Sequence, residues 1–188
     1  PTLWRDPAGR LRLIYNQADL TKREFGVWTV TLDPDDGPEA AARRDPRHLD
    51  LDVPFAFRMN KPIVLTTGDW ILPVTWAEAA PEGWFPHDRQ LQGVAISADQ
   101  GATWTLHGAV QAPAWALENM VVELKDGRLW MLIRTGAGVL WQSFSEDGGW
   151  SWSEGEPGGI VNPGTRFFIG RLNSGRLLLI NTFNPEAR

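Results

Sequence analysis

The chain has 188 residues, of which 43% are hydrophobic, and its formal net charge at pH 7 is −5. This length allows one domain with a sizeable hydrophobic core, whereas the negative charge disfavours nucleic acids and anionic membranes as partners. The absence of cysteine excludes disulfides and thiolate metal sites, and no apolar stretch is long enough to span a bilayer.

Paired hydrophobic runs recur along the chain, and each pair is joined by a turn that contains a glycine. In chain order they read TLWRDPAGRLRLIY, PIVLTTGDWILPV, MVVELKDGRLWMLI and RFFIGRLNSGRLLLI, with Gly9, Gly68, Gly127 and Gly175 in the turns. Short runs rich in Leu, Val, Ile and Trp around such turns predict β-hairpins. The only helix-tolerant stretch, residues 35–52, is rich in Pro, Ala and charge, and we interpret it as an exposed excursion.

The hairpins repeat at intervals of roughly fifty residues, and the third is followed by two more strand-like runs. Four strands in a unit of this length are typical of a β-propeller blade. We therefore predict an all-β propeller of four-stranded antiparallel blades, with boundaries near 1–57, 58–112, 113–160 and 161–188. The last unit holds only half a blade. Because an open ring leaves strand edges unpaired, we expect the remaining blades to come from further sequence or from another chain.

Two clusters, SADQGATW at 97–104 and SEDGGWSW at 145–152, share the pattern Ser-x-Asp-x-Gly-x-(Ser/Thr)-Trp. The Asp would accept backbone N–H groups within a tight turn, the Gly would allow the turn, and the Trp would fill the gap between strands. A calcium loop is the alternative, although each cluster offers few carboxylates. The pattern is that of the Asp-box, and it resembles the repeats of the sialidase (neuraminidase) superfamily of β-propellers.

The resemblance extends to MNKPIVLTTGDWILPVTW, LENMVVELKDGRLWMLIRT and NPGTRFFIGRLNSGRLLLI, and it is weakest at residues 33–57. It implies a ring that is six-bladed when complete. It also implies an exo-glycosidase that cleaves a terminal acidic sugar of the sialic acid type, without a cofactor or a metal ion. The chain shows no signal peptide, so that secreted, periplasmic and cytoplasmic locations all stay open.

In such blades the first strand begins, and the second ends, on the face opposite the Asp-boxes, where sialidase-like proteins place their substrate. The residues that we expect on this face are Tyr15, Asn16, Arg58, Asn60, Lys61, Trp76, Glu78, Glu118, Asn119, Arg134, Arg166, Asn181 and Asn184. Positive charge from Arg58 and Lys61 in a cleft of an acidic protein would attract an anionic ligand. Trp84 and His87 follow in a long loop, where they could shape the pocket.

Glu118 and Arg134 match two positions of the sialidase layout. The resemblance implies that Glu118 accepts the proton of a nucleophilic Tyr, and that Arg134 grips the substrate carboxylate with a second arginine, Arg166. An arginine fork suits this task because it forms two parallel hydrogen bonds and stays charged. The alternative is a surface Glu–Arg pair that bridges two strands, with Arg166 a charge on the rim.

The chain departs from the family pattern at the remaining catalytic positions. The family's nucleophilic Tyr belongs to a late blade, whereas the only Tyr here is Tyr15. Asp88 is a speculative acid/base candidate in the loop. A non-catalytic carbohydrate-binding or scaffold propeller, and a glycosidase of the same fold with a different sugar specificity, are therefore alternatives to the sialidase-like hydrolase.

Overall fold

A computed structural model describes residues 1–19, 24–33, 35–37, 39, 45–53, 55–78, 90–113 and 115–184. Their secondary structure consists almost entirely of strands, β1 to β15, which confirms the all-β prediction. Trp84, His87 and Asp88 lie outside the described residues. Within the part that is described, no helix has the length and apolarity needed to cross a membrane.

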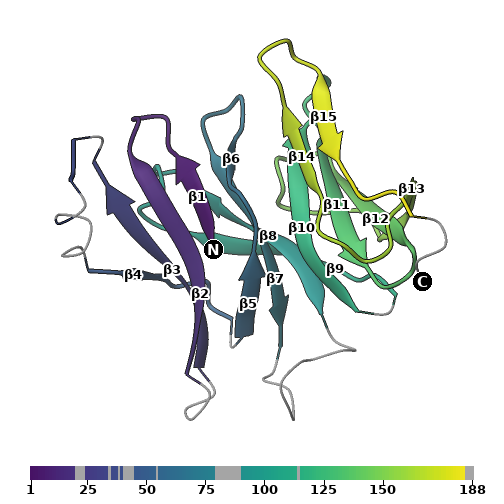
Figure 1. Cartoon of the computed structure of the whole chain (residues 1–188), viewed down its shortest axis with the longest axis horizontal. Coiled ribbons are helices and arrows are strands. Elements are labelled where there is room, and N and C mark those ends of the chain that lie inside the picture. The colour runs from purple at the N-terminus through teal and green to yellow at the C-terminus, as the bar shows by residue number, and fades with distance from the viewer. Residues whose placement is uncertain are drawn as a thin grey trace.

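The strands fall into four sets, which we call strand groups one to four, and Figure 1 shows them following one another from purple to yellow. Group one consists of β1 (Thr2–Arg5), β2 (Leu11–Asp19), β3 (Glu24–Leu32) and β4 (Arg47–Leu49), paired antiparallel in that order. The strand β4 lies within the stretch that the sequence analysis interpreted as an excursion. Buried Leu49 and Leu51 explain this difference, because they anchor the segment to the core.

In group two, β5 (Phe55–Met59) and β6 (Ile63–Val64) both pair with β7 (Trp70–Ala77), which is followed by β8 (Leu91–Ser97) and β9 (Thr105–Val110). The break between β5 and β6 contains Pro62, which has no N–H to donate to a ladder. One parallel pair, Phe25 with Phe55, joins groups one and two into a single sheet.

Group three is the antiparallel sheet of β10 (Ala116–Glu123), β11 (Leu129–Thr135), β12 (Val139–Ser145) and β13 (Glu156–Val161). Group four is the hairpin of β14 (Phe168–Arg171) and β15 (Leu177–Ile180). All four predicted hairpins form, as β1–β2, β6–β7, β10–β11 and β14–β15.

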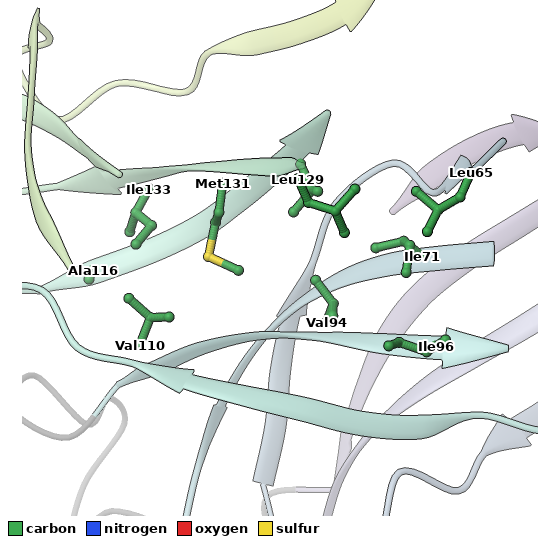
Figure 2. Close-up of a cluster of buried hydrophobic side chains, with 10 residues drawn as sticks. Leu65, Ile71, Val94, Ile96, Val110, Ala116, Leu129, Met131 and Ile133 are labelled. Carbon is green, nitrogen blue, oxygen red and sulfur yellow. The ribbon is translucent and has the colours of Figure 1, made fainter. Parts of the chain in front are cut away.

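Hydrophobic side chains fill the interfaces between neighbouring groups. Leu129, Met131 and Ile133 alternate along β11 and pack against Ile71 and Val94 of group two (Figure 2). The opposite face of the same sheet, including Leu132, packs against β14. Since each buried aliphatic side chain stabilises the fold by about 1.5–3 kcal/mol, these two interfaces hold the groups side by side.

Both Asp-boxes form the expected tight turns. Thr103 N–H donates to Asp99 Oδ1 at 2.8 Å and Gly101 N–H to Ser97 Oγ at 2.8 Å, and the second box repeats both bonds. Gly101 has a φ of 83°, which a side chain would disfavour. Trp104 and Trp152 pack against the interface clusters. Each carboxylate is thus engaged by its own loop, which favours a structural role for the boxes over a calcium site.

The Asp-boxes lie at the hairpin-turn ends of their groups. Trp70, at the start of β7, pairs with Ser97, and Leu129, at the start of β11, pairs with Ser145. The opposite ends of the sheets carry the start of β10 and the end of β11, where Leu117 pairs with Arg134. The candidate residues Glu118 and Arg134 are therefore remote from both boxes.

Candidate functional site

Glu118 lies in a β-bulge at the start of β10. The register passes from Leu117 opposite Arg134 to Met120 opposite Leu132, so that Glu118 and Asn119 together face one residue of β11. Glu118 has a φ of 53°, in the left-handed region that few residues other than glycine adopt. The bulge turns its side chain out of the regular alternation of the strand.

The Glu118 carboxylate is buried, with 6% of the side chain exposed, and arginines hold both of its oxygens. Arg134 Nη1 donates to Oε2 at 2.7 Å, while Arg166 donates to Oε1 through Nη2 at 2.6 Å and Nε at 3.0 Å. Arg58 Nε lies 4.0 Å from Oε1. These four side chains thus carry one negative and three positive charges.

Each of the two bonded arginines is positioned by further contacts. Arg134 Nε donates to the Gly164 carbonyl at 2.7 Å, and its guanidinium lies over the Trp115 ring at 5.0 Å. Arg166 follows a turn that buried Asn162 holds, because Asn162 Oδ1 accepts the N–H groups of Gly164 and Thr165. The loop before β14 therefore brings Arg166 to Glu118 from group four.

The ionisation of Glu118 follows from these contacts. Burial raises the pKa of Glu118, but the hydrogen bonds and charges of Arg166 and Arg134 outweigh burial, so that its pKa lies below the usual value. Glu118 is therefore ionised at neutral pH, and it is a weaker proton acceptor than an ordinary glutamate. Its observed contacts suit the orientation of two arginine forks.

Glu118 and Arg166 open onto a cavity of about 370 Å³, which lies within the range of small-molecule sites, about 300–1,000 Å³. Its walls come from all four strand groups. The lining residues are Pro1, Thr2, Asn16, Arg58, Met59, Asn60, Glu118, Arg166 and Phe167. The cavity is therefore polar and positively charged, with apolar contacts from Met59 and Phe167.

Most of the residues predicted from the sequence gather here. Asn16, Arg58, Asn60, Glu118 and Arg166 line the cavity, and Arg134 contacts Glu118. Lys61 is exposed next to this group, and its backbone N–H donates to Asn60 Oδ1 at 3.0 Å. Tyr15, unlike Asn16, packs against the core cluster between groups one and two.

Two of the predicted substrate-binding residues, Asn119 and Trp76, lie outside this cavity. Asn119 is 1% exposed, and its amide donates to the Val74 and Gly93 carbonyls at 3.2 and 3.1 Å, so that it faces the protein interior. Trp76 donates from Nε1 to the Gly108 carbonyl at 3.2 Å and lines a separate cavity with Trp104. Successive side chains on a strand point to opposite faces, and the neighbouring Thr75 takes the face toward Glu118.

Thr75 and Phe167 belong to the site but were not predicted from the sequence. Thr75 contacts the Glu118 backbone, and Phe167 forms part of the cavity wall. Thr75 stands in an otherwise apolar strand, WILPVTWA, and a polar residue in such a run is a signal that could have identified it. Phe167 carries no comparable signal, because it reads as an ordinary core residue.

A sequence model of one family, described as BNR repeat-like domain, matches residues 1–188. No curated protein matches the chain in sequence. Solved structures do share its fold. One is a protein of unknown function from Dyadobacter fermentans DSM 18053, at 16% identity and a TM-score of 0.68, covering 94% of this chain and 54% of that one.

Two further similar structures are sialidases by name. The Hadza microbial sialidase Hz136 shows 16% identity and a TM-score of 0.67, over 92% of this chain and 37% of that one. The intramolecular trans-sialidase from Ruminococcus gnavus shows 23% identity and a TM-score of 0.60, over 84% and 33%. The chain thus spans about half or less of the length of each of these proteins. Together with the Asp-boxes, these similarities confirm the sialidase-like fold expected from the sequence.

Proposed function

The chain belongs to the BNR repeat-like domain family, and from this premise we propose that it forms part of a β-propeller glycosidase acting on a terminal acidic sugar. The strand groups would be blades of the ring, with the remaining blades supplied by further sequence or by another chain. Support comes from the antiparallel groups and from the two Asp-boxes at the turn ends of groups two and three.

The observation that carries the proposal is the cluster of Glu118, Arg134 and Arg166, of which Glu118 and Arg166 line the cavity. Among the described residues, no hydrogen bond uses Arg134 Nη2 or Arg166 Nη1, so that each guanidinium retains a donor for a ligand. A carboxylate accepts such donors in short, charge-assisted bonds. Excess positive charge at the cavity favours an anionic sugar over a neutral one.

In the proposed reaction, the arginines hold the sugar's carboxylate while Glu118 keeps the arginines in place. The scissile bond breaks through a transition state with oxocarbenium character, and Glu118 acts on it through the arginines that it orients. The chain's only Tyr, Tyr15, packs in the core.

A second candidate function is carbohydrate binding without catalysis. It is favoured by the same position of Tyr15 and by the low pKa of Glu118, which makes this carboxylate a poor base. The arginine cluster would then capture an acidic glycan and release it unchanged. The third alternative, a glycosidase for another sugar, differs only in the substrate that fits the cavity.

The test is turnover of a fluorogenic aryl sialoside and an aryl glucuronide by the purified protein, combined with calorimetric titration of the free sugar acids. Hydrolysis that Arg134→Ala abolishes supports the glycosidase, and the preferred substrate identifies the sugar. Binding without hydrolysis selects the second candidate. If the protein neither binds nor hydrolyses an acidic sugar, both candidate functions are overturned. Arg128→Ala serves as the control, because Arg128 pairs with Asp126 in the β10–β11 turn.

A further inference from the structure

Three fully buried polar side chains lie directly beneath the Glu118 bulge. Thr75 of β7 is 1% exposed, Gln92 of β8 is 0% exposed and Asn119 of β10 is 1% exposed. None of them lines the cavity. Polar groups are costly to bury unless they are hydrogen-bonded, so that a cluster of them under one site residue calls for a role.

The hydrogen bonds of this cluster have a defined direction. The Thr75 hydroxyl donates to Gln92 Oε1 at 2.9 Å and accepts the Glu118 N–H at 3.0 Å. A hydroxyl has a single proton, so that donation to Gln92 turns its lone pairs toward Glu118. Gln92 is oriented in turn, because its Nε2 donates to the Ala116 carbonyl at 2.9 Å. Asn119 Nδ2 lies 3.3 Å from Gln92 Oε1 and completes the cluster.

These hydrogen bonds hold Glu118, whose backbone conformation is unfavourable for a residue other than glycine. The left-handed φ of Glu118 persists only where its surroundings over-determine it. Thr75 holds its N–H, and Asn60 Nδ2 donates to its carbonyl at 3.4 Å. Side chains of group two thus hold both polar groups of the Glu118 backbone, while the carboxylate extends to arginines of groups three and four.

We propose that Thr75, oriented by Gln92, is a positioning residue that aims the Glu118 carboxylate at Arg134 and Arg166. The proposal rests on the function proposed above, since it concerns the same site. Without the Thr75 hydroxyl, the Glu118 N–H loses its acceptor, and the bulge relaxes toward a regular strand. The carboxylate then leaves the arginines, and the arginines lose the geometry that receives the ligand.

Thr75→Val tests this, because it keeps the shape of the side chain and removes the hydroxyl. In Thr75→Val we expect kcat/KM on the acidic aryl glycoside to fall about 10- to 100-fold, which is the usual effect of misplacing a group in an active site. In Thr75→Ser, which restores the hydroxyl, kcat/KM should lie within about 3-fold of the parent value. Ser143→Ala is the control, since Ser143 is buried, donates to the Ser153 carbonyl and does not line the cavity. It should lower Tm while leaving kcat/KM unchanged.

A second readout needs no substrate. The charged groups that face Glu118 are Arg58 of β5, Arg134 of β11 and Arg166 before β14, and a carboxylate that moves away from them titrates at higher pH. Carboxyl carbon NMR, assigned with Glu118→Gln, should therefore show a higher Glu118 pKa in Thr75→Val than in the parent. Ser143→Ala should leave that pKa in place.

The two readouts separate the two proposals. A parent protein without turnover overturns the glycosidase, whereas a raised Glu118 pKa in Thr75→Val still supports the positioning role. Thr75→Val with unchanged kcat/KM and unchanged Glu118 pKa overturns the positioning role, whatever its Tm. If Thr75→Val does not fold, Gln92→Met takes its place. A raised Glu118 pKa in Gln92→Met then supports the positioning role, and an unchanged Glu118 pKa overturns it.

Discussion

Glu118 and Arg166 are 48 positions apart in the sequence, yet Arg166 Nη2 lies 2.6 Å from Glu118 Oε1. The pair joins the start of β10 in group three to the loop before β14, and Arg134 binds the other carboxylate oxygen. A contact between two groups therefore organises the cavity, and the charge of Glu118 is its central element.

We expect Glu118→Gln to reduce activity at least ~100-fold, because the amide removes the anion to which both Arg134 and Arg166 donate. Because Glu118 is buried while Arg166 is largely exposed, losing these bonds should also lower the free energy of unfolding by about 1–3 kcal/mol. Turnover and urea unfolding measure the two effects. Glu146→Gln, at an exposed Asp-box position, is the matched control. Full activity of Glu118→Gln would show that the cluster is only structural.

Arg134→Lys should lower kcat/KM about 10- to 100-fold, although it preserves the charge. A lysine ammonium has three donors on a single nitrogen, and it lacks the planar fork with which Arg134 reaches Glu118 and the Gly164 carbonyl from separate nitrogens. Steady-state kinetics should show the loss mainly in KM if Arg134 holds the ground-state carboxylate. Arg128→Lys provides the comparison, and equal kinetics for the two variants would contradict the role of Arg134.

The free energy of unfolding should fall at acidic pH, over a pH range that the two Asp-box carboxylates, Asp99 and Asp147, determine. Hydrogen bonds from Thr103 lower the pKa of Asp99 to about 2 from 3.8. For Asp147, burial opposes the shift, but bonds from Ser151 and Ser145 lower its pKa to about 2 as well. A carboxyl group whose pKa is lower in the folded state than in the unfolded state stabilises the fold at any pH above its unfolded-state pKa. This stabilisation is lost as the pH falls through the folded-state pKa.

Thermal unfolding between pH 7 and pH 2 should thus show Tm falling from about pH 4 downward. The double variant Asp99→Asn, Asp147→Asn should have a lower Tm at pH 7 and a shallower decline in acid. Parallel curves for the parent and the double variant would mean that other carboxylates set the acid response. Glu118, whose pKa is also lowered, contributes with the same sign.

Met131→Ala should destabilise the protein by about 2–5 kcal/mol, because it leaves a cavity in the interface between groups two and three. Trp150→Ala is the control, since Trp150 is 62% exposed and its truncation opens no cavity in the core. Urea unfolding with each variant measures the difference. A cost below ~1 kcal/mol for Met131 would indicate that the two groups do not pack as described.

The hairpins and Asp-boxes could be predicted because their chemistry is local. A glycine turn between apolar runs, or an Asp that bonds its own loop, is complete within a few residues. Residues 35–52 were harder, since β4 is held by the burial of Leu49 and Leu51 against distant strands. The pairing of two short strands, β5 and β6, with β7 depends equally on the partner strand.

In the site, Glu118 and Arg134 were found through a resemblance, and the errors have one physical source. Strand alternation decides which face a side chain takes, and the bulge shifts that alternation by one residue. Asn119 therefore faces the interior beside Glu118, which faces the cavity. The bond between Thr75 and Glu118 joins residues 43 positions apart, and no local pattern encodes it.

The cavity takes its walls from four strand groups, whereas the described side chains that bond the Glu118 backbone belong to group two. Selection can therefore act on the two sets separately. Substitutions at Asn16, in group one, or at Phe167 can alter which ligand fits without disturbing the bulge. Such a division lets descendants of one ancestral pocket diverge in specificity while they inherit the same anchored carboxylate.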